Sequence, residues 1–350
     1  MALTTNQINY LNVGLMIGSC LLAFGYPFEL FLFSYAVLGP LHYVTEISWL
    51  HERNYFTADQ APKRPAAKRP SAKRPERAHA GWLVLVGVTM AALIAGFVAA
   101  EWAGRPIDPK FEITLFYLVF VTALLVTVIR QRSTRVLVIV SAMVLFGMLS
   151  VSRYYIILAF FLVTIVHVLI FTAAFVLYGA LKGRSTSGLI SLAVFLACIA
   201  SFFVYVPAGH LTSDYVRHSY RSFNALNAEL IKLLRLGPGT SAAEVYDSQT
   251  GFMVMRLIAF AYTYHYLNWF SKTSIIKWHQ VPRRRTLAMV LVWVGALALY
   301  VYDYDNGMAA LYFLSILHVM LEFPLNHLTF VGIGKELHAW TRITAVELES

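Results

Sequence analysis

The chain has 350 residues, of which 59% are apolar, 15% aromatic and only 13% charged. Soluble domains are typically about 45–50% apolar and about 25% charged, so this composition excludes an ordinary soluble domain. Charges are few because long stretches contain none, and about 20 apolar residues in a helix cross the hydrocarbon core of a bilayer. The stretches are continuous and do not alternate with polar residues, which favours helices over a transmembrane barrel. The sequence therefore predicts an all-α polytopic integral membrane protein.

Much of the net charge of +10 lies in one short segment, between Arg53 and Arg77. Such a segment beside apolar helices indicates membrane topology and an anionic membrane surface, so we expect membrane lipids and no nucleic acid as partners. The two cysteines, Cys20 and Cys198, lie inside apolar stretches, which argues against a disulfide or a Cys-x-x-Cys metal site. No basic region precedes the first apolar stretch, so we expect the first helix to be retained.

In chain order, the apolar stretches predict about ten transmembrane helices within a single membrane domain, residues 1–350. They lie near residues 8–26, 28–50, 81–101, 111–131, 134–152, 154–181, 186–207, 251–271, 286–304 and 308–331. Alternate loops are rich in lysine and arginine, namely residues 51–80, 130–135, 182–184 and 272–285. Such loops are cytoplasmic under the positive-inside rule, which places both termini on the cytoplasmic side of a multi-pass cell (inner) membrane.

Two segments are not predicted to span the membrane. Residues 59–77, within the basic cytoplasmic linker 51–80, repeat proline with lysine and arginine, which predicts an extended chain. Residues 208–250 form the long extracytoplasmic loop, where apolar residues recur at helical spacing and predict an amphipathic helix. Binding of anionic lipid by the linker and a lid role for the loop are alternatives to simple connections.

One chemical pattern, His-x3-Glu-x4-His, occurs twice in the chain. Its residues are His42, Glu46 and His51 in the second predicted span, and His318, Glu322 and His327 in the tenth. Residues four apart lie on one helix face, about 6 Å apart along the axis, so the first histidine and the glutamate of each copy can point at one place. Ionisable residues within a membrane are costly and are therefore candidates for function. An imidazole and a carboxylate from each of two helices are similar to the ligand sets of non-haem iron sites.

The eighth predicted span adds His265, with Tyr264 and Asn268 beside it. The second, eighth and tenth spans run in the same direction under the predicted topology. His42, His265 and Glu322 each lie about 14 residues into their spans, so these groups are expected within about one or two helical turns of each other in depth. This agreement favours one shared site in the cytoplasmic half of the membrane.

The last histidine of each copy, His51 and His327, fits the shared site less well. Five positions after a glutamate correspond to a rotation of about 140° around a straight helix. These residues could join the site only where the helix ends or bends, and Pro324 and Gly39-Pro40 predict bends. A lone intramembrane histidine in the sixth predicted span, His167, is expected to have a structural hydrogen-bonding role.

Other sequence motifs give no competing assignment. The chain contains no nucleotide-binding loop, no Gly-x-Ser-x-Gly motif and no Cys-x-x-Cys-His haem attachment. Histidines gathered among membrane helices are similar in style to the membrane di-iron desaturases and hydroxylases. The His-x3-His and His-x2-His-His boxes of those enzymes are absent, so no residue role is transferred from them.

The preferred interpretation is a membrane-embedded, metal-dependent oxidoreductase or oxygenase that acts on a lipid-like substrate from the inner leaflet, with one or two iron ions as cofactor. Zinc and manganese are the alternative metals, and an oxidative enzyme would use a redox partner. The expected metal ligands are His42, Glu46, His265, His318 and Glu322, with His51 and His327 of lower rank. Tyr264 and Asn268 are the expected catalytic residues, placed to orient the ligands.

Two other functions could use the same residues. A transporter of a metal or small solute would use the histidines and glutamates as a transient or proton-coupled site. The two motif helices run in the same direction, which differs from the inverted repeats of many transporters. A metal-free membrane acyl or prenyl transferase would use a histidine as general base.

Overall fold

The computed structural model describes residues 3–57, 73–105, 108–129, 131–150, 164–237, 241–272, 277 and 280–348. Within these ranges all regular secondary structure is helical, as the sequence predicts. The α-helices are α1 (Thr5–Gly25), α2 (Pro27–Phe33), α3 (Gly39–Glu52), α4 (Lys73–Trp102), α5 (Pro109–Thr127), α6 (Arg132–Ser150), α8 (Thr172–Lys182), α9 (Thr186–Val204), α10 (Asp214–Tyr220), α11 (Asn224–Leu234), α12 (Ala242–Asp247), α13 (Gln249–Ser271), α15 (Arg283–Tyr302) and α16 (Tyr304–Leu348). Two π-helical segments, Ser34–Leu38 and Val166–Phe171, lie directly before α3 and α8.

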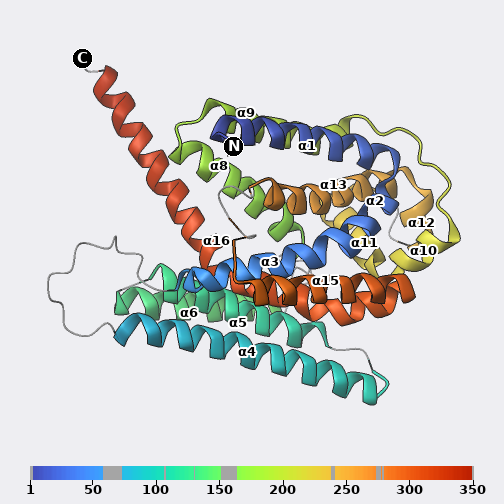
Figure 1. Ribbon diagram of the computed structural model, residues 1–350, viewed down its shortest axis with the longest axis horizontal. Helices are drawn as coiled ribbons and strands as arrows, with labels where there is room; N and C mark the ends of the chain where they lie inside the picture. Colours follow the sequence, from blue (N-terminus) through green and yellow to red (C-terminus); the bar gives the residue numbers. More distant parts are fainter. Residues whose placement is uncertain are drawn as a thin grey trace.

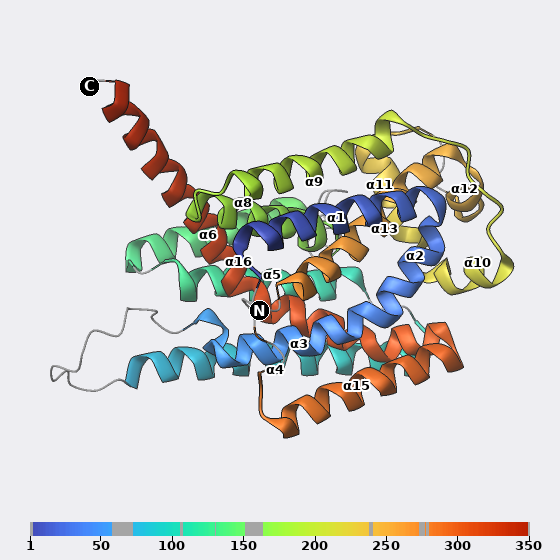
Figure 2. The same ribbon diagram turned by 45° about the horizontal axis from the view of Figure 1, so that its top comes forward.

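The long helices share one general direction, so the molecule is a bundle with two ends (Figure 1 and Figure 2). At one end, which we call the basic end, the turn Lys182–Arg184 joins α8 to α9, and Arg285 at the start of α15 pairs with Glu52 at the end of α3. The opposite end, which we call the cap end, holds the short helices α10, α11 and α12. Figure 1 shows the start of α1 toward the basic end, and the C-terminal part of α16 extends beyond the bundle there.

In the described part of the chain, seven helices are long and apolar enough to cross a membrane, which indicates an integral multi-pass membrane protein. They are Thr5–Gly25, Pro27–Glu52, His79–Trp102, Lys110–Thr127, Thr186–Val204, Arg283–Tyr302 and Tyr304–Thr341. Large apolar side chains on their outer faces are exposed, such as Leu21 at 66% and Val84 at 64%. Such surfaces suit contact with lipid, where every backbone polar group is already paired within a helix.

The most enclosed helix, α13, is not among these seven although it has 23 residues. Every side chain from Val254 to Tyr266 is buried, and several of them are polar, including Arg256, Thr263 and His265. A helix that is covered on all sides by other helices has no need of a lipid-compatible surface. Helices α1 and α2 pack along α13, and its polar groups bond to other parts of the protein: Thr263 to Ser34, and Arg256 to the Pro207 carbonyl.

Some element boundaries differ from those the sequence predicts. The last helix, α16, continues to Leu348, well past the predicted end near residue 331, and includes Pro324. The predicted extended linker 59–77 ends earlier than the sequence suggests, because α4 begins at Lys73. Pro75 lies in the first turn of α4. A proline in the first turn lacks only an N–H that has no helical partner there. Residues 154–163 of the sixth predicted span and 59–72 of the linker lie outside the described residues.

A wide helical turn precedes α3 because of its Gly39-Pro40 sequence. A proline inside an α-helix has no N–H to donate, and its ring collides with the carbonyl four residues earlier. In the π-helical segment Ser34–Leu38 the bonds reach one residue further back, and Gly39 N–H donates to the Ser34 carbonyl. This local change of pitch accommodates Pro40 and sets the rotation of α3, which carries His42.

Ion pairs join the helices of the cap end to one another. Arg217 of α10 lies 2.6 Å from Asp247 of α12, and this guanidinium holds the pKa of the Asp247 carboxyl below its usual range. Arg221 and His218 both contact Asp305 at the start of α16. Exposed ion pairs contribute little stability each, so the buried apolar face of α11 is the main attachment of the cap.

The connection from α12 to α13 is tight at Gly251. A Cβ atom at Gly251 would lie 2.3 Å from the Val245 carbonyl oxygen and 2.6 Å from the Glu244 carbonyl oxygen. These are backbone atoms, which cannot rotate away as the end of a side chain can. The position therefore requires glycine for close contact between α12 and α13.

We expect Gly251→Ala to destabilise the protein by about 1–3 kcal/mol, because the added methyl group forces α12 away from α13. The measurement is the thermal unfolding midpoint of the detergent-purified protein. Gly14→Ala is the matched control, since a Cβ at Gly14 meets nothing within 4 Å. Equal midpoints for the two variants would contradict the close contact.

Candidate metal centre

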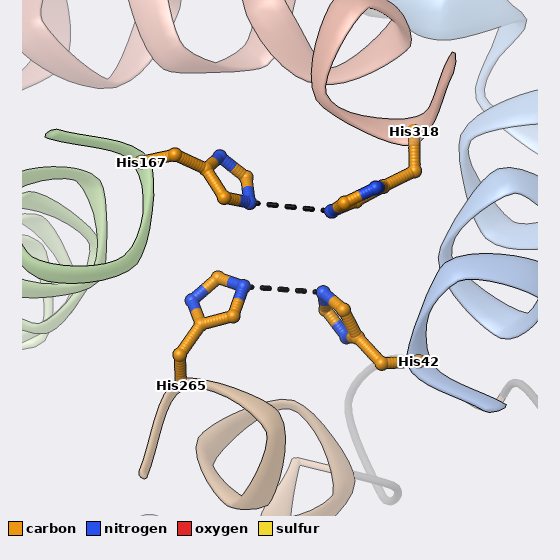
Figure 3. A group of neighbouring side chains, drawn as sticks. All are labelled: His42, His167, His265 and His318. Atoms are coloured by element: carbon orange, nitrogen blue, oxygen red, sulfur yellow. Dashed lines mark hydrogen bonds between the residues drawn. The ribbon is translucent and has the colours of Figure 1, made fainter. Parts of the chain in front are cut away.

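Four histidines from four different segments meet in the middle of the bundle. His42 lies on α3, His167 in the π-helical segment before α8, His265 on α13 and His318 on α16. Between 1% and 7% of each residue is exposed. Figure 3 shows the four rings directed toward one centre. We call these residues the four-histidine cluster, and each offers a ligand nitrogen within 4.8 Å of the others.

The closest contacts in the cluster join Nε2 atoms in two pairs. His42 Nε2 lies 3.2 Å from His265 Nε2, and His318 Nε2 lies 3.3 Å from His167 Nε2. In a tetrahedral zinc site with nitrogens about 2.0–2.1 Å from the ion, all ligand nitrogens are about 3.3–3.4 Å apart. The two closest pairs in the cluster match this separation, and all four ligand nitrogens lie within 4.8 Å of one another. The cluster can therefore hold a metal ion.

Two carboxylates are buried against the cluster. Glu46 Oε2 lies 3.0 Å from His42 Nε2, and Glu322 Oε2 lies 3.2 Å from His167 Nδ1. Glu46 is 1% exposed and Glu322 is 3% exposed. In the described part of the chain, the ion-pair contacts of both glutamates are to histidines and not to lysine or arginine. Buried carboxylates without a cation are costly, so a metal ion in the cluster would stabilise them.

The two glutamates contact different nitrogens of their histidines. Glu46 contacts Nε2 of His42, the same atom that faces His265. Glu322 contacts Nδ1 of His167, whose Nε2 faces the cluster. Glu322 Oε2 and His167 Nδ1 are close enough for a hydrogen bond, but the His167 ring is not aligned to form one. A carboxylate at the far nitrogen orients a metal-binding histidine, so Glu46 is placed as a ligand and Glu322 as an orienting group.

His265 is oriented in the same way by a hydroxyl group. Thr172 Oγ1 lies 2.8 Å from His265 Nδ1, which leaves Nε2 directed at the cluster. Thr172 begins α8, directly after the segment that carries His167. The Asn326 side-chain amide donates to Glu322 at 3.4 Å and so supports the other orienting group. His265 therefore has a hydrogen-bond partner at Nδ1, whereas Nδ1 of His42, His167 and His318 has none among the described residues.

A cavity of about 240 Å³ borders the cluster on the side of the cap end. His167, His265 and His318 line this cavity, and neither glutamate does. Beside the cluster, the hydroxyl oxygens of Tyr43 and Tyr266 are 2.9 Å apart, and the Tyr43 ring stacks on His318 at 4.2 Å between centroids. A molecule in the cavity would therefore contact the cluster from the side opposite the carboxylates.

The structure brings together some predicted site residues and not others. Those in or against the cluster are His42, Glu46, His265, His318 and Glu322. His51 is exposed at the basic end, and His327 Nε2 lies 3.0 Å from the Phe120 carbonyl oxygen. Tyr264 donates to Asn12 and Asn268 at 3.2 Å and 3.4 Å, in a separate buried network between α13 and α1. Neither Tyr264 nor Asn268 has a described contact with the cluster.

His167 belongs to the cluster, although the sequence suggested a structural role. No glutamate follows it at a spacing of four, so it lies outside the repeated motif. Its depth gave a usable signal, since it lies about 14 residues into the predicted span 154–181, as His42 and His265 do in theirs. Depth within a span is therefore the signal that could have added His167 to the predicted site.

No protein-family model, curated protein or solved structure matches the chain significantly. The interpretation of the cluster therefore depends on its geometry and on the chemistry of its side chains.

We expect Thr172→Val to weaken metal binding by about 10–100-fold, because the His265 ring loses the hydrogen bond that fixes its orientation. Competition against a chelator of known affinity measures the change. Thr263→Val is the control. Thr263 lies on the same helix as His265, and the substitution removes a buried hydroxyl that bonds to Ser34. Equal affinities in the two variants would contradict the orienting role of Thr172.

Proposed function

We propose that this protein is a membrane-embedded metalloenzyme, an iron-dependent oxidoreductase or oxygenase that acts on an apolar, lipid-like substrate. The observation that carries the proposal is the four-histidine cluster with two buried carboxylates on one side and a cavity on the other. Imidazole together with carboxylate is the ligand type of mononuclear non-haem iron sites. When bound, iron would supply one-electron chemistry that the side chains of the cavity lack.

A divalent metal ion in the cluster would balance the charge of the two glutamates. The two glutamates bring a formal charge of −2, four neutral imidazoles bring none, and a divalent ion brings +2, for a sum of zero. A buried charge without a partner is costly in an apolar medium, so the ion and the glutamates stabilise each other. This balance holds for iron and also for zinc or manganese.

The two sides of the cluster differ in a way that favours catalysis over transport. On the cavity side, three histidines border open space where a substrate can reach the metal. On the other side, Glu46 contacts His42, and Asn326 fills the space beside Glu322. Catalytic metal sites keep one position open, whereas a transport site needs access from both sides in turn.

The residues of the cavity next to the cluster can position a substrate. Tyr43 and Tyr266 form a phenol pair whose hydroxyl groups can donate a hydrogen bond to a polar atom of the substrate. A Cβ at Gly39 would lie 3.0 Å from the Tyr43 hydroxyl and 3.2 Å from that of Tyr266, so glycine leaves room for this pair. The apolar remainder of the cavity excludes water from the reacting atoms.

We further propose that the chain crosses the membrane ten times, with α6, α13 and the helix that includes α8 joining the seven long apolar helices. Both termini and the basic end would then be cytoplasmic. The cavity extends from the cluster toward the cap end. We therefore place substrate access on that side, and not at the inner leaflet as the depth of the histidines alone suggests.

Elemental analysis of the detergent-purified protein tests the metal site. We expect about one or two iron ions per chain, lost in His167→Ala because a ligand is removed from the cluster. His51→Ala is the matched control, since His51 belongs to the sequence motif but is exposed at the basic end. Size-exclusion elution and the unfolding midpoint show whether each variant is folded, and His167→Gln replaces His167→Ala if the latter is not.

The metal found, and its response to each variant, decide between the candidate functions. Iron that is lost with His167 and kept with His51 supports an oxidative enzyme. Zinc or manganese would keep the site and overturn the redox assignment in favour of hydrolysis or group transfer. Absence of any metal from unchelated wild-type protein would overturn the proposal in favour of transport or metal-free transfer.

The two glutamates should respond differently to substitution. Glu46→Gln removes a candidate ligand charge and is expected to change the electronic spectrum of cobalt bound at the cluster. Glu322→Gln acts through His167, so we expect a loss of about 10–100-fold in metal affinity with a smaller spectral change. Identical spectra for both variants would contradict the division of roles.

A further inference from the structure

Among the described residues that line the cavity, one is a carboxylate, and it lies at the end away from the four-histidine cluster. Glu112, in the first turn of α5, accepts a hydrogen bond of 3.3 Å from the Tyr312 hydroxyl, and both residues line the cavity. This bond uses one carboxylate oxygen, Oε1. The second oxygen remains able to accept a hydrogen bond from a molecule in the cavity.

Many aromatic rings line the cavity that holds Glu112. Seven tyrosine and phenylalanine side chains line the cavity, among them Tyr35, Phe116 and Phe223. Aromatic faces carry partial negative charge and attract organic cations. None of the described lining residues is lysine or arginine, so the described wall offers neither of these side chains to pair with an anionic group.

We infer that the cavity binds an amphiphilic organic cation, a molecule with an ammonium group attached to an apolar chain. The ammonium group would donate to Glu112 among the aromatic rings, and the apolar chain would extend to the cluster. The inference rests on the proposed function, because it names the class of substrate that the metal centre would act on. A carboxylate or phosphate group in the same place would be repelled by Glu112.

The dimensions of the cavity limit the size of this molecule. Tyr312 and His318 are six residues apart on α16, which corresponds to about 9 Å along the helix axis. The cavity that joins them has a volume of about 240 Å³. A ligand that reaches from Glu112 to the cluster therefore needs a chain about 9 Å long.

A matched series of three eight-carbon probes tests the charge preference: n-octylamine, n-octanol and n-octanoate. Binding is measured by calorimetry on the metal-loaded protein in phosphatidylcholine nanodiscs, with empty nanodiscs as blank. The amine is charged at pH 7, as a lysine side chain is. We expect octylamine to bind at least about tenfold more tightly than octanol, which corresponds to about 1.4 kcal/mol, and octanoate to bind most weakly.

Glu112→Gln keeps the shape of the side chain and removes its charge. It should bring the affinities for octylamine and octanol to within about twofold of each other. Glu101→Gln is the matched control, because Glu101 is an exposed glutamate at the end of α4 and does not line the cavity. Phe223→Leu, which removes a ring and keeps an apolar wall, should weaken octylamine binding more than octanol binding.

The metal content of every sample is measured alongside binding, which separates this inference from the proposed function. Octylamine binding that equals octanol binding in fully metal-loaded protein would overturn the cation preference and leave the metal centre intact. An amine preference that persists in Glu112→Gln would overturn the assignment of Glu112. Amine binding in protein that holds no metal would support the cation site while the proposed enzyme fails.

Discussion

The structure depends on the burial of six ionisable side chains, the four-histidine cluster with Glu46 and Glu322, inside a bundle with an apolar exterior. Such groups are stable only where they meet one another or a cation, because nothing else in an apolar medium compensates their charge and polarity. The six residues come from four segments far apart in the chain. Each segment must therefore hold a fixed rotation and depth, and this requirement explains the polar contacts around the cluster.

The helices that carry the cluster differ from those that face lipid. The central helix α13 is polar for a membrane helix because its neighbours are other helices and their side chains. Both α3 and α8 follow a π-helical segment, which rotates the residues after it relative to a regular helix. Such segments occur often at functional sites. Here they direct His42 and His167 into the same space, and the second brings Thr172 against His265.

The two ends of the bundle have separate roles in this arrangement. Toward the basic end, carboxylate and amide side chains close the space behind the cluster. Toward the cap end, the cavity continues past the tyrosines to Glu112 and lies against Phe223 and Leu226 beneath the short helices. A molecule held between Glu112 and the cluster would be enclosed by the cap, whose ion pairs lie outside the cavity.

Hydropathy and four-residue spacing are local properties, and from them and from depth the sequence predicts the helical membrane class, most of the long apolar helices and five residues that lie at the cluster. The sequence did not place His167 at the cluster, because no local motif includes it. It did not exclude His51 and His327 from the cluster, because both belong to the repeated His-x3-Glu-x4-His motif. These placements follow from the fold, because the rotation of α3 and the position of His167 depend on π-helical turns and on packing between distant segments. The cavity and the pairing of Glu112 with Tyr312 likewise arise from contacts across 200 residues of sequence, which no local pattern records.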